Sequence, residues 1–172
     1  GAIHAVLSNW TLTNNIATIV MPTGTGKTEV MLSLLIRGLC EKLLVVVPTD
    51  ALRNQISKKF INLGVLKDFN IITDKARYPI VGIIKHKFQS PDEANHFFKN
   101  CNVAVTTMNI AGQMDSIIQK SIVEQISHLF IDEAHHTEAP TWREFKDLFH
   151  ENPKKRIIQF TATPFRNDGK RL

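Results

Sequence analysis

Short apolar runs alternate with longer amphipathic segments along the whole chain. The short runs are almost continuously apolar and rich in β-branched residues, which is typical of strands buried on both faces of a parallel sheet. They occupy residues 16–21, 43–47, 80–84, 103–106, 128–131 and 156–160. Segments with helical spacing of their apolar residues lie between them, at 28–39, 51–63, 91–100 and 116–126. We predict an α/β fold, a three-layer sandwich with a mainly parallel sheet covered by helices on both faces.

Local signals refine some of these boundaries. Ser90 is followed by Pro91 and Glu93, which predicts a helix capped by the serine. Thr141 and Glu144 have the spacing of a capping box and predict the start of a further helix. That helix is expected to bury Trp142, Phe145, Leu148 and Phe149. The first ten residues predict a helix entered part-way, and residues 64–78 are predicted to be mostly loop.

Residues that could take part in binding or catalysis directly follow the predicted strands. Parallel sheets bind their ligands beyond the carboxyl ends of the strands. We therefore expect the segments after these strands to meet in one site, and no internal repeat or linker divides the chain. The segments are 21–28, 48–49, 106–107, 132–133 and 161–163.

The segment 21–28 reads M-P-T-G-T-G-K-T and joins a predicted strand to a predicted helix. This arrangement is typical of a phosphate-binding loop, because glycines let the backbone approach the phosphates and the N–H groups of the following helix point at the anion. Met21 stands where the full pattern has glycine, so a turn that merely contains G-x-G-K is the alternative at this point. The residues predicted to hold the nucleotide phosphates are Thr23, Gly24, Thr25, Gly26, Lys27 and Thr28.

Asp132 and Glu133 end the apolar run H-L-F-I and are candidates for catalysis beside Lys27. Phosphoryl transfer to water requires a metal that neutralises the phosphate oxygens and a group that orients the attacking water. We assign the Mg²⁺ to Asp132, through its water shell, and to the hydroxyl of Thr28, with Glu133 as the base. An exposed acidic turn is the alternative reading of Asp132 and Glu133 alone, and the G-K-T loop argues against it.

Composition limits the class of protein. The chain has 172 residues, of which 43% are hydrophobic and 22% charged, which is ordinary for one globular domain. No apolar run approaches the length of a membrane span, and no signal peptide pattern occurs, so we expect a cytoplasmic protein without membrane contact. Cys40 and Cys101 lack metal-site spacing and are expected to be free buried thiols. The net charge of +5 fits a polyanionic partner such as ATP or nucleic acid.

Five segments in this order resemble motifs I, Ia, Ib, II and III of superfamily 2 helicases and translocases. They are M-P-T-G-T-G-K-T (21–28), P-T-D-A-L-R-N-Q (48–55), V-T-T-M-N (105–109), D-E-A-H (132–135) and T-A-T-P (161–164). The closer subgroup is similar to the DNA translocases related to type I and type III restriction enzymes. The resemblance spans residues 3–166 and implies a RecA-like P-loop NTPase domain that hydrolyses ATP with Mg²⁺.

The resemblance favours DNA over RNA as the track, the nucleic acid along which the protein would move. D-E-A-D-box RNA helicases have aspartate at the position of His135 and usually S-A-T in place of 161–163. RNA helicases of the splicing D-E-A-H type usually have an arginine pair where this chain has Thr49 and Asp50. An RNA helicase half, or a module in which ATP switches a protein contact without motor activity, stays as an alternative.

The resemblance also implies roles for single residues and for partners. Thr49 and Arg53, with Thr106 and Thr107, would contact a nucleic-acid backbone, double-stranded DNA being expected. His135, Thr161 and Thr163 would couple the nucleotide site to motion. Family members complete the site with arginines of a second RecA-like domain and recognise adenine through a segment upstream of motif I. We therefore expect residues 1–172 to be a first RecA-like domain that is monomeric and nearly inactive alone.

Overall fold

A computed structural model gives the structure of residues 1–13, 15–22, 24–37, 40–69, 71–73, 77–133 and 140–162. Its centre is a sheet in which every pair of neighbouring strands is parallel, in the order β1-β6-β5-β2-β4-β3. The strands are β1 (Ala17–Val20), β2 (Leu43–Val47), β3 (Val81–Ile83), β4 (Val103–Thr107), β5 (His128–Ile131) and β6 (Arg156–Thr161). The predicted α/β fold with a parallel sheet is confirmed, and each apolar run contains a strand.

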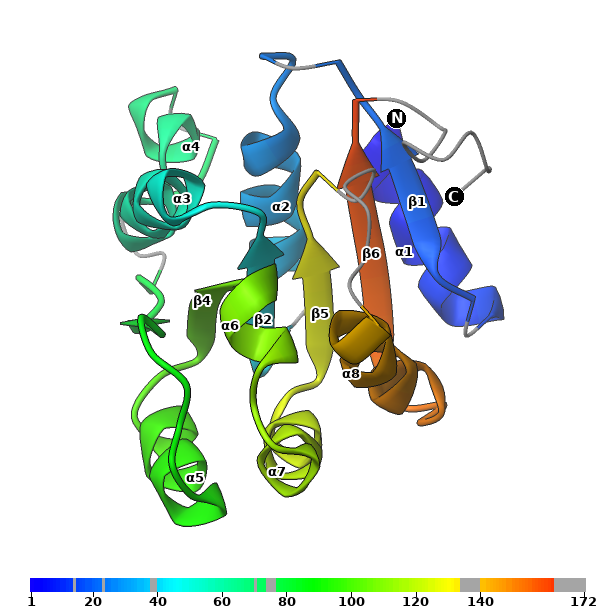
Figure 1. Ribbon diagram of the computed structural model, residues 1–172. Helices are drawn as coiled ribbons and strands as arrows, with labels where there is room; N and C mark the ends of the chain where they lie inside the picture. Colours follow the sequence, from blue (N-terminus) through cyan, green and yellow to red (C-terminus); the bar gives the residue numbers. More distant parts are fainter. Residues whose placement is uncertain are drawn as a thin grey trace.

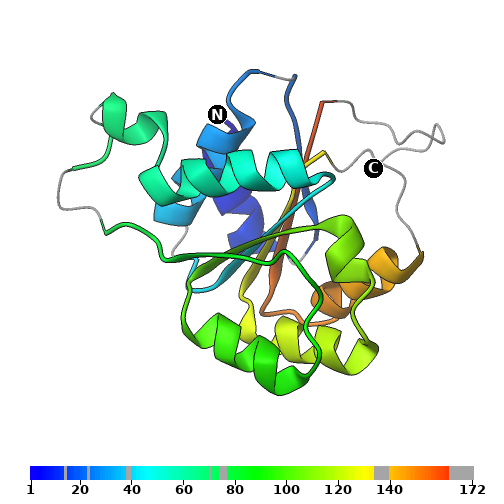
Figure 2. The same cartoon turned by 60° about the vertical axis from the view of Figure 1, so that its left-hand side comes forward.

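Helices cover both faces of this sheet (Figure 1). One face packs against α1 (Ala2–Leu12), α2 (Lys27–Arg37), α3 (Asp50–Asn62) and α4 (Val65–Asp68). The other face packs against α5 (Pro91–Lys99), α6 (Met108–Gly112), α7 (Ser116–Gln125) and α8 (Pro140–His150). Figure 2, turned to the side, shows the sheet between these two helical layers.

Successive side chains of the central strand β2 point to opposite faces of the sheet, which explains why the strand is apolar throughout. Leu44 and Val46 enter the core beneath α5–α8, whereas Leu43, Val45 and Val47 enter the core beneath α1–α4. A strand with helices on both sides has no position that meets water, so a continuous apolar run is required. The two cores therefore share one sheet.

The structure corrects the predicted start of α8 and adds two short helices. The helix begins at Pro140, so Thr141 lies inside its first turn and the proposed capping box of Thr141 and Glu144 is wrong. Proline is favoured in a first turn because the N–H that it lacks would have no helical partner there. Trp142, Phe145 and Phe149 are buried as predicted, with Leu148 packed beside them. Helix α4 lies within the segment predicted to be mostly loop, and α6 was not predicted.

The predicted cap of α5 is confirmed, since Ser90 Oγ accepts a hydrogen bond from the Glu93 N–H at 3.2 Å. Cys40 and Cys101 are free and buried, and burial raises the pKa of the Cys40 thiol to about 12. In the described part of the chain, no helix has the length and apolar character that a membrane crossing requires.

His128, at the start of β5, generates a prediction about stability. Burial and the nearby Arg156 lower its pKa to about 4, from 6.5. The unfolded chain therefore binds more protons between these values, and the stability provided by the neutral ring is lost as pH falls from about 6.5 to about 4. We expect His128→Phe, which keeps a ring beside Trp10, to reduce the loss of unfolding free energy between pH 7 and pH 4.5 by about 1–3 kcal/mol.

Urea unfolding at the two pH values measures this effect. The control is His96→Phe, because His96 is exposed on α5 and should leave the pH dependence as in the wild type. An identical pH dependence for His128→Phe and the wild type would contradict the assignment.

Candidate active site

The segment between β1 and α2 has the geometry of an anion-binding loop. Gly24 and Gly26 have φ values of +82° and +96°, in the left-handed region that favours glycine. The hydroxyl and the N–H of Thr25 both donate to the carbonyl oxygen of Pro22, at 2.6 and 3.3 Å, which closes the turn. Helix α2 then begins at Lys27, and the N–H groups of its first turn have no partners within the helix. These N–H groups and the positive end of the helix favour a phosphate at this position.

Lys27 meets two carboxylates that are distant in the sequence. Its side chain is 9% exposed, and its ammonium forms an ion pair with Glu133 and lies 4.0 Å from Asp132 Oδ1. Asp132 follows the end of β5 and is anchored there, because its N–H donates to the Val46 carbonyl oxygen of β2 at 2.8 Å. The loop after β1 and the turn after β5 thus form one site, as the sequence predicted for parallel strands.

Backbone conformation aims the second carboxylate. Glu133 has a φ of +53°, which is rare for a residue with a side chain and is found where surrounding structure enforces it. Its N–H donates to Asp132 Oδ1 at 3.0 Å, which holds the Asp132 carboxylate in the turn. Two acidic groups that are adjacent in sequence consequently both face Lys27.

The Asp132 carboxyl is the perturbed group of the site. Asp132 is 5% exposed, and burial raises its pKa, as the neighbouring Glu133 does to a smaller extent. The charge of Lys27 and the hydrogen bond from the Glu133 N–H act in the opposite direction and lower the pKa. The site therefore contains excess negative charge at low solvation, which a divalent cation would relieve.

A cavity of about 530 Å³ opens over these residues. The predicted residues Gly24, Thr25, Gly26, Lys27, Thr28, Asp132 and Glu133 all line it. Its opposite wall was not predicted and consists of Leu52, Gln55, Ile56 and Lys59 of α3 with Val65 of α4. The cavity thus lies between the loop and the α3–α4 helices, which are on the same face of the sheet.

An ion pair crosses the rim of this cavity. Lys59 Nζ of α3 lies 2.9 Å from Glu29 Oε1 in the first turn of α2, and both residues line the cavity. The pair neutralises a carboxylate that stands beside the anion-binding loop. Sequence spacing gave no signal for it, because the partners lie on different helices.

Thr161, predicted to act in coupling, is fully buried at the end of β6. Its carbonyl oxygen accepts a hydrogen bond from the Met21 N–H at 2.8 Å, directly before the anion-binding loop. The end of β6 is therefore connected to the loop through the backbone. The predicted site residues Thr23, His135 and Thr163 lie outside the described residues.

The residues predicted to contact nucleic acid end β4 or begin α3. Thr49 is exposed, and its side chain caps α3 by accepting a hydrogen bond from the Leu52 N–H. Arg53 is 5% exposed, and its Nη1 lies 2.7 Å from Asp50 Oδ1. Its Nε has no hydrogen-bond partner among the described residues. Thr106 is fully buried, and Thr107 is buried and caps α6. In this conformation Thr49 presents its side chain to solvent, and the other three residues do not.

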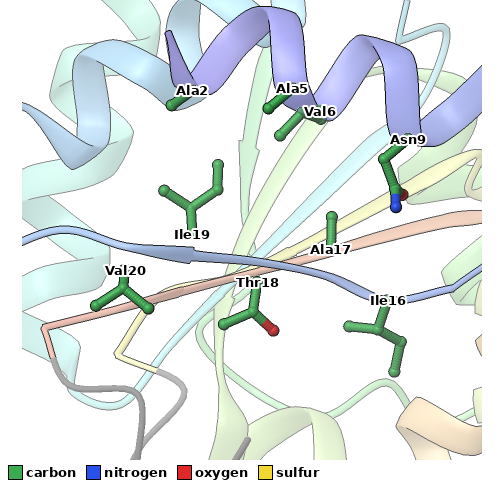
Figure 3. A pocket seen from close by; sticks show the side chains of 9 residues that line it. All are labelled: Ala2, Ala5, Val6, Asn9, Ile16, Ala17, Thr18, Ile19 and Val20. Carbon is green, nitrogen blue, oxygen red and sulfur yellow. The ribbon is translucent and has the colours of Figure 1, made fainter.

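A second cavity, of about 430 Å³, lies between α1 and β1 (Figure 3). Small side chains of α1, Ala2 and Ala5, leave this space above Ile19 and Ala17 of the strand. Its lining carries no charged side chain and includes none of the predicted site residues. We therefore take the cavity lined by Lys27 as the candidate active site.

The cavity residues fit a nucleotide triphosphate with Mg²⁺. The loop and Lys27 offer N–H donors and a cation to phosphate oxygens, and Thr28 and Asp132 offer the oxygen ligands that Mg²⁺ prefers. Mg²⁺ in such sites takes one or two protein ligands and receives the others from phosphate and water, so this small ligand set is sufficient.

Comparison with known proteins identifies the family of this chain. The family described as type III restriction enzyme, res subunit, matches residues 1–166. Among curated proteins, none matches this chain. The solved structures that are similar to it include the three described next. T4 UvsW has a TM-score of 0.62 and 17% identity, with 94% of this chain and 29% of that chain covered.

The second structure is the Hef helicase domain of Pyrococcus furiosus, with a TM-score of 0.60, 21% identity, and coverage of 94% of this chain and 32% of that one. The third is a hypothetical ATP-dependent RNA helicase from Sulfolobus tokodaii, with a TM-score of 0.57, 19% identity, and coverage of 95% and 46%. At these identities the likeness shows the shared fold. The chain spans less than half the length of each of these structures.

Removal of the Lys27 charge tests the electrostatics of the site. Lys27→Met would leave Asp132 and Glu133 facing each other without a cation, and we expect the unfolding free energy at pH 7 to fall by about 1–3 kcal/mol. Without Lys27 the already raised pKa of Asp132 rises further. A carboxyl with a folded pKa above its unfolded value destabilises the fold above that pKa, so the loss should be smaller at pH 5 than at pH 7.

Chemical denaturation of Lys27→Met, Glu133→Gln and the double variant at both pH values checks this. The double variant Lys27→Met/Glu133→Gln should recover part of the unfolding free energy that Lys27→Met loses, because an amide then replaces the Glu133 carboxylate beside Asp132. Lys58→Met, at an exposed position of α3, is the matched control. Equal losses at pH 5 and pH 7 for Lys27→Met would contradict the account.

Proposed function

This chain belongs to the family of the type III restriction enzyme res subunit, and from that premise we propose that it is the ATP-binding motor domain of a superfamily 2 DNA helicase or translocase. In this proposal the protein couples ATP hydrolysis to movement on DNA or to its unwinding. The observation that carries it is the convergence of Lys27, Asp132 and Glu133 beside the glycine loop in one cavity.

The position of each residue in the cavity supports a role in hydrolysis. Lys27 binds the β- and γ-phosphates together with the loop N–H groups. Thr28 and Asp132 hold Mg²⁺, which supplies neutralisation of the phosphate oxygens when it is bound. Glu133 orients the attacking water and accepts its proton, a task for which its carboxylate must face the cavity.

The ion pair between Lys27 and Glu133 implies an exchange of partners during this reaction. In the present structure the ammonium of Lys27 is occupied by Glu133. A phosphate group that takes Lys27 as its partner releases the Glu133 carboxylate for water. Binding of the triphosphate and activation of the base are thereby connected through one lysine.

A second RecA-like domain would complete the site. Arginines supplied from a neighbouring domain stabilise the charge that develops in phosphoryl transfer, and their loss costs about 10³–10⁵ in rate. The present chain spans less than half the length of each of the similar structures. Thr161, joined by its carbonyl oxygen to Met21, would connect motion of that domain to the loop.

Two features favour DNA as the track. The family is that of a restriction enzyme subunit, and the motif residues differ from those of D-E-A-D-box RNA helicases at His135. The similar structures include both the Hef helicase domain and a hypothetical ATP-dependent RNA helicase, so RNA is the second candidate.

Glu133→Gln in the full-length protein tests the catalytic assignment. The amide keeps the size of the side chain but cannot accept a proton, so ATP hydrolysis should fall by about 10²–10⁴-fold while ATP–Mg²⁺ still binds. Lys27→Ala should lose nucleotide binding. Steady-state hydrolysis and equilibrium binding of a fluorescent ATP analogue measure the two effects. Glu41→Gln, an exposed glutamate before β2, is the control, and near-wild-type turnover of Glu133→Gln would remove Glu133 from the mechanism.

Stimulation of hydrolysis identifies the track. We expect duplex DNA to raise the ATPase rate of the full-length protein more than single-stranded DNA or RNA does. Stimulation by RNA alone would establish the second candidate, and a rate unaffected by any nucleic acid would favour an ATP-dependent switch. The isolated 172-residue chain should hydrolyse ATP very slowly, and brisk turnover by it would refute the need for a second domain.

A further inference from the structure

The strand order divides the carboxyl edge of the sheet into two parts. The anion-binding loop and the two carboxylates of the nucleotide cavity come from the segments after β1 and β5, and β6 ends between these strands. Helices α3 and α4 form the opposite wall of the cavity. The strands β2, β4 and β3 continue the sheet beyond it in that order. All neighbouring strands are parallel, so their carboxyl ends share one edge of the sheet. Any track that follows this edge away from the nucleotide passes the ends of β2, β4 and β3.

Pairing register places three segments in a row along this part of the edge. Val47 of β2 is paired with Thr107 of β4, so the residues after β2 lie beside the end of β4. The Ile84 N–H, just after β3, donates to the Val105 carbonyl oxygen at 3.0 Å. Lys85 therefore follows at the level at which β4 ends.

We propose that Lys85 and Lys87, in the segment between β3 and α5, bind the phosphodiester backbone of nucleic acid at the end of this row. The proposal rests on the function proposed above and adds a contact outside the motif segments. Lys85, His86 and Lys87 are consecutive and all exposed, whereas Ile84 before them is buried. The segment thus presents its cations outward from a fixed strand end.

The other groups along the row leave this positive charge available. Among the described residues, Lys85 and Lys87 form no ion pair. Arg53 is buried and paired with Asp50. Asp92 and Glu93 lie in the first turn of α5, and Glu93 accepts a hydrogen bond from the Gln89 N–H at 2.7 Å. Within the described part of the chain, neither carboxylate forms an ion pair with the two lysines. The two lysines are therefore exposed cations at the place where a backbone would leave Thr49.

Dimensions of the row fit a nucleic-acid strand. Neighbouring strands of a sheet lie about 4.8 Å apart, so the ends of β2 and β3, with β4 between them, are separated by roughly 10 Å. One strand of duplex DNA rises about 3.4 Å per phosphate, so roughly three phosphates span that distance. The lysines would hold phosphates that Thr49 does not reach, and such contacts position the backbone without reading its sequence.

The test is the salt dependence of DNA binding by the full-length protein. Each phosphate neutralised in a duplex contributes about 0.9 to the slope of log K against log salt concentration. Lys85→Gln/Lys87→Gln should therefore reduce that slope by about 1.8, so that its affinity deficit relative to wild type shrinks roughly tenfold between about 50 and 200 mM salt. Fluorescence anisotropy with a labelled duplex of fixed length measures both quantities.

The control variant removes the same charge elsewhere. Lys99 ends α5 and Lys154 precedes β6, so both exposed lysines lie near the amino ends of the strands. Lys99→Gln/Lys154→Gln should keep the wild-type slope. An unchanged slope for Lys85→Gln/Lys87→Gln, or an equal reduction in the control, would overturn the proposal.

Further measurements separate this inference from the proposed function. Single-stranded DNA and RNA of the same length distinguish the source of the backbone, and for single strands the expected reduction is about 1.4. A wild-type protein that binds none of the three at low salt would overturn both the track and the contact. Normal binding with unchanged slopes would overturn the lysine contact alone. Equal melting temperatures of the variants exclude misfolding as the cause of a changed slope.

Discussion

The site depends on one electrostatic constraint: Lys27 and the carboxylates of Asp132 and Glu133 lie together at a position largely shielded from solvent. Burial alone would favour the neutral form of Asp132, and the charge of Lys27 acts against that tendency. The arrangement persists because the sheet holds its parts separately: Asp132 is hydrogen-bonded to β2, and Lys27 begins α2. The left-handed conformation of Glu133 then directs the second carboxylate to the same ammonium. A phosphate group and a cation bound here would replace contacts that Lys27, Asp132 and Glu133 make with one another.

The fold and the convergence of Lys27 with Asp132 and Glu133 were predictable, because both follow from burial and from the parallel pairing of the strands. A run such as Leu43–Val47 is apolar at every position, and a strand between two helical layers explains that pattern. Once the strands are parallel, the segments that follow them must meet at one edge. The juxtaposition of Lys27 with Asp132 and Glu133 therefore follows from the topology of the sheet.

Features that depend on contacts between distant helices were not predictable. The pair of Glu29 with Lys59 joins α2 to α3, and neither residue has a local pattern that names its partner. Helices α4 and α6 are too short to show a helical period. The threonine and glutamate at the start of α8 have the spacing of a capping box, but Pro140 already occupies the first position and moves Thr141 into the helix. The sequence pattern also does not predict how exposed an individual polar side chain is. The burial of Thr106 is therefore seen only in the structure.

The place of β1 at the edge of the sheet has a consequence for how the protein opens. This strand is hydrogen-bonded to β6 on one side, over the four register pairs from Ala17 to Val20, and among the described strands it has no second neighbour. Edge elements with few partners separate at lower free energy than the central strands, so we expect β1 and the anion-binding loop to open together before the central strands do. A ligand held between that loop and the turn after β5 would bind the closed form alone, and its binding energy would close the edge. Amide exchange along β1 is thus a direct gauge of how firmly the site is assembled.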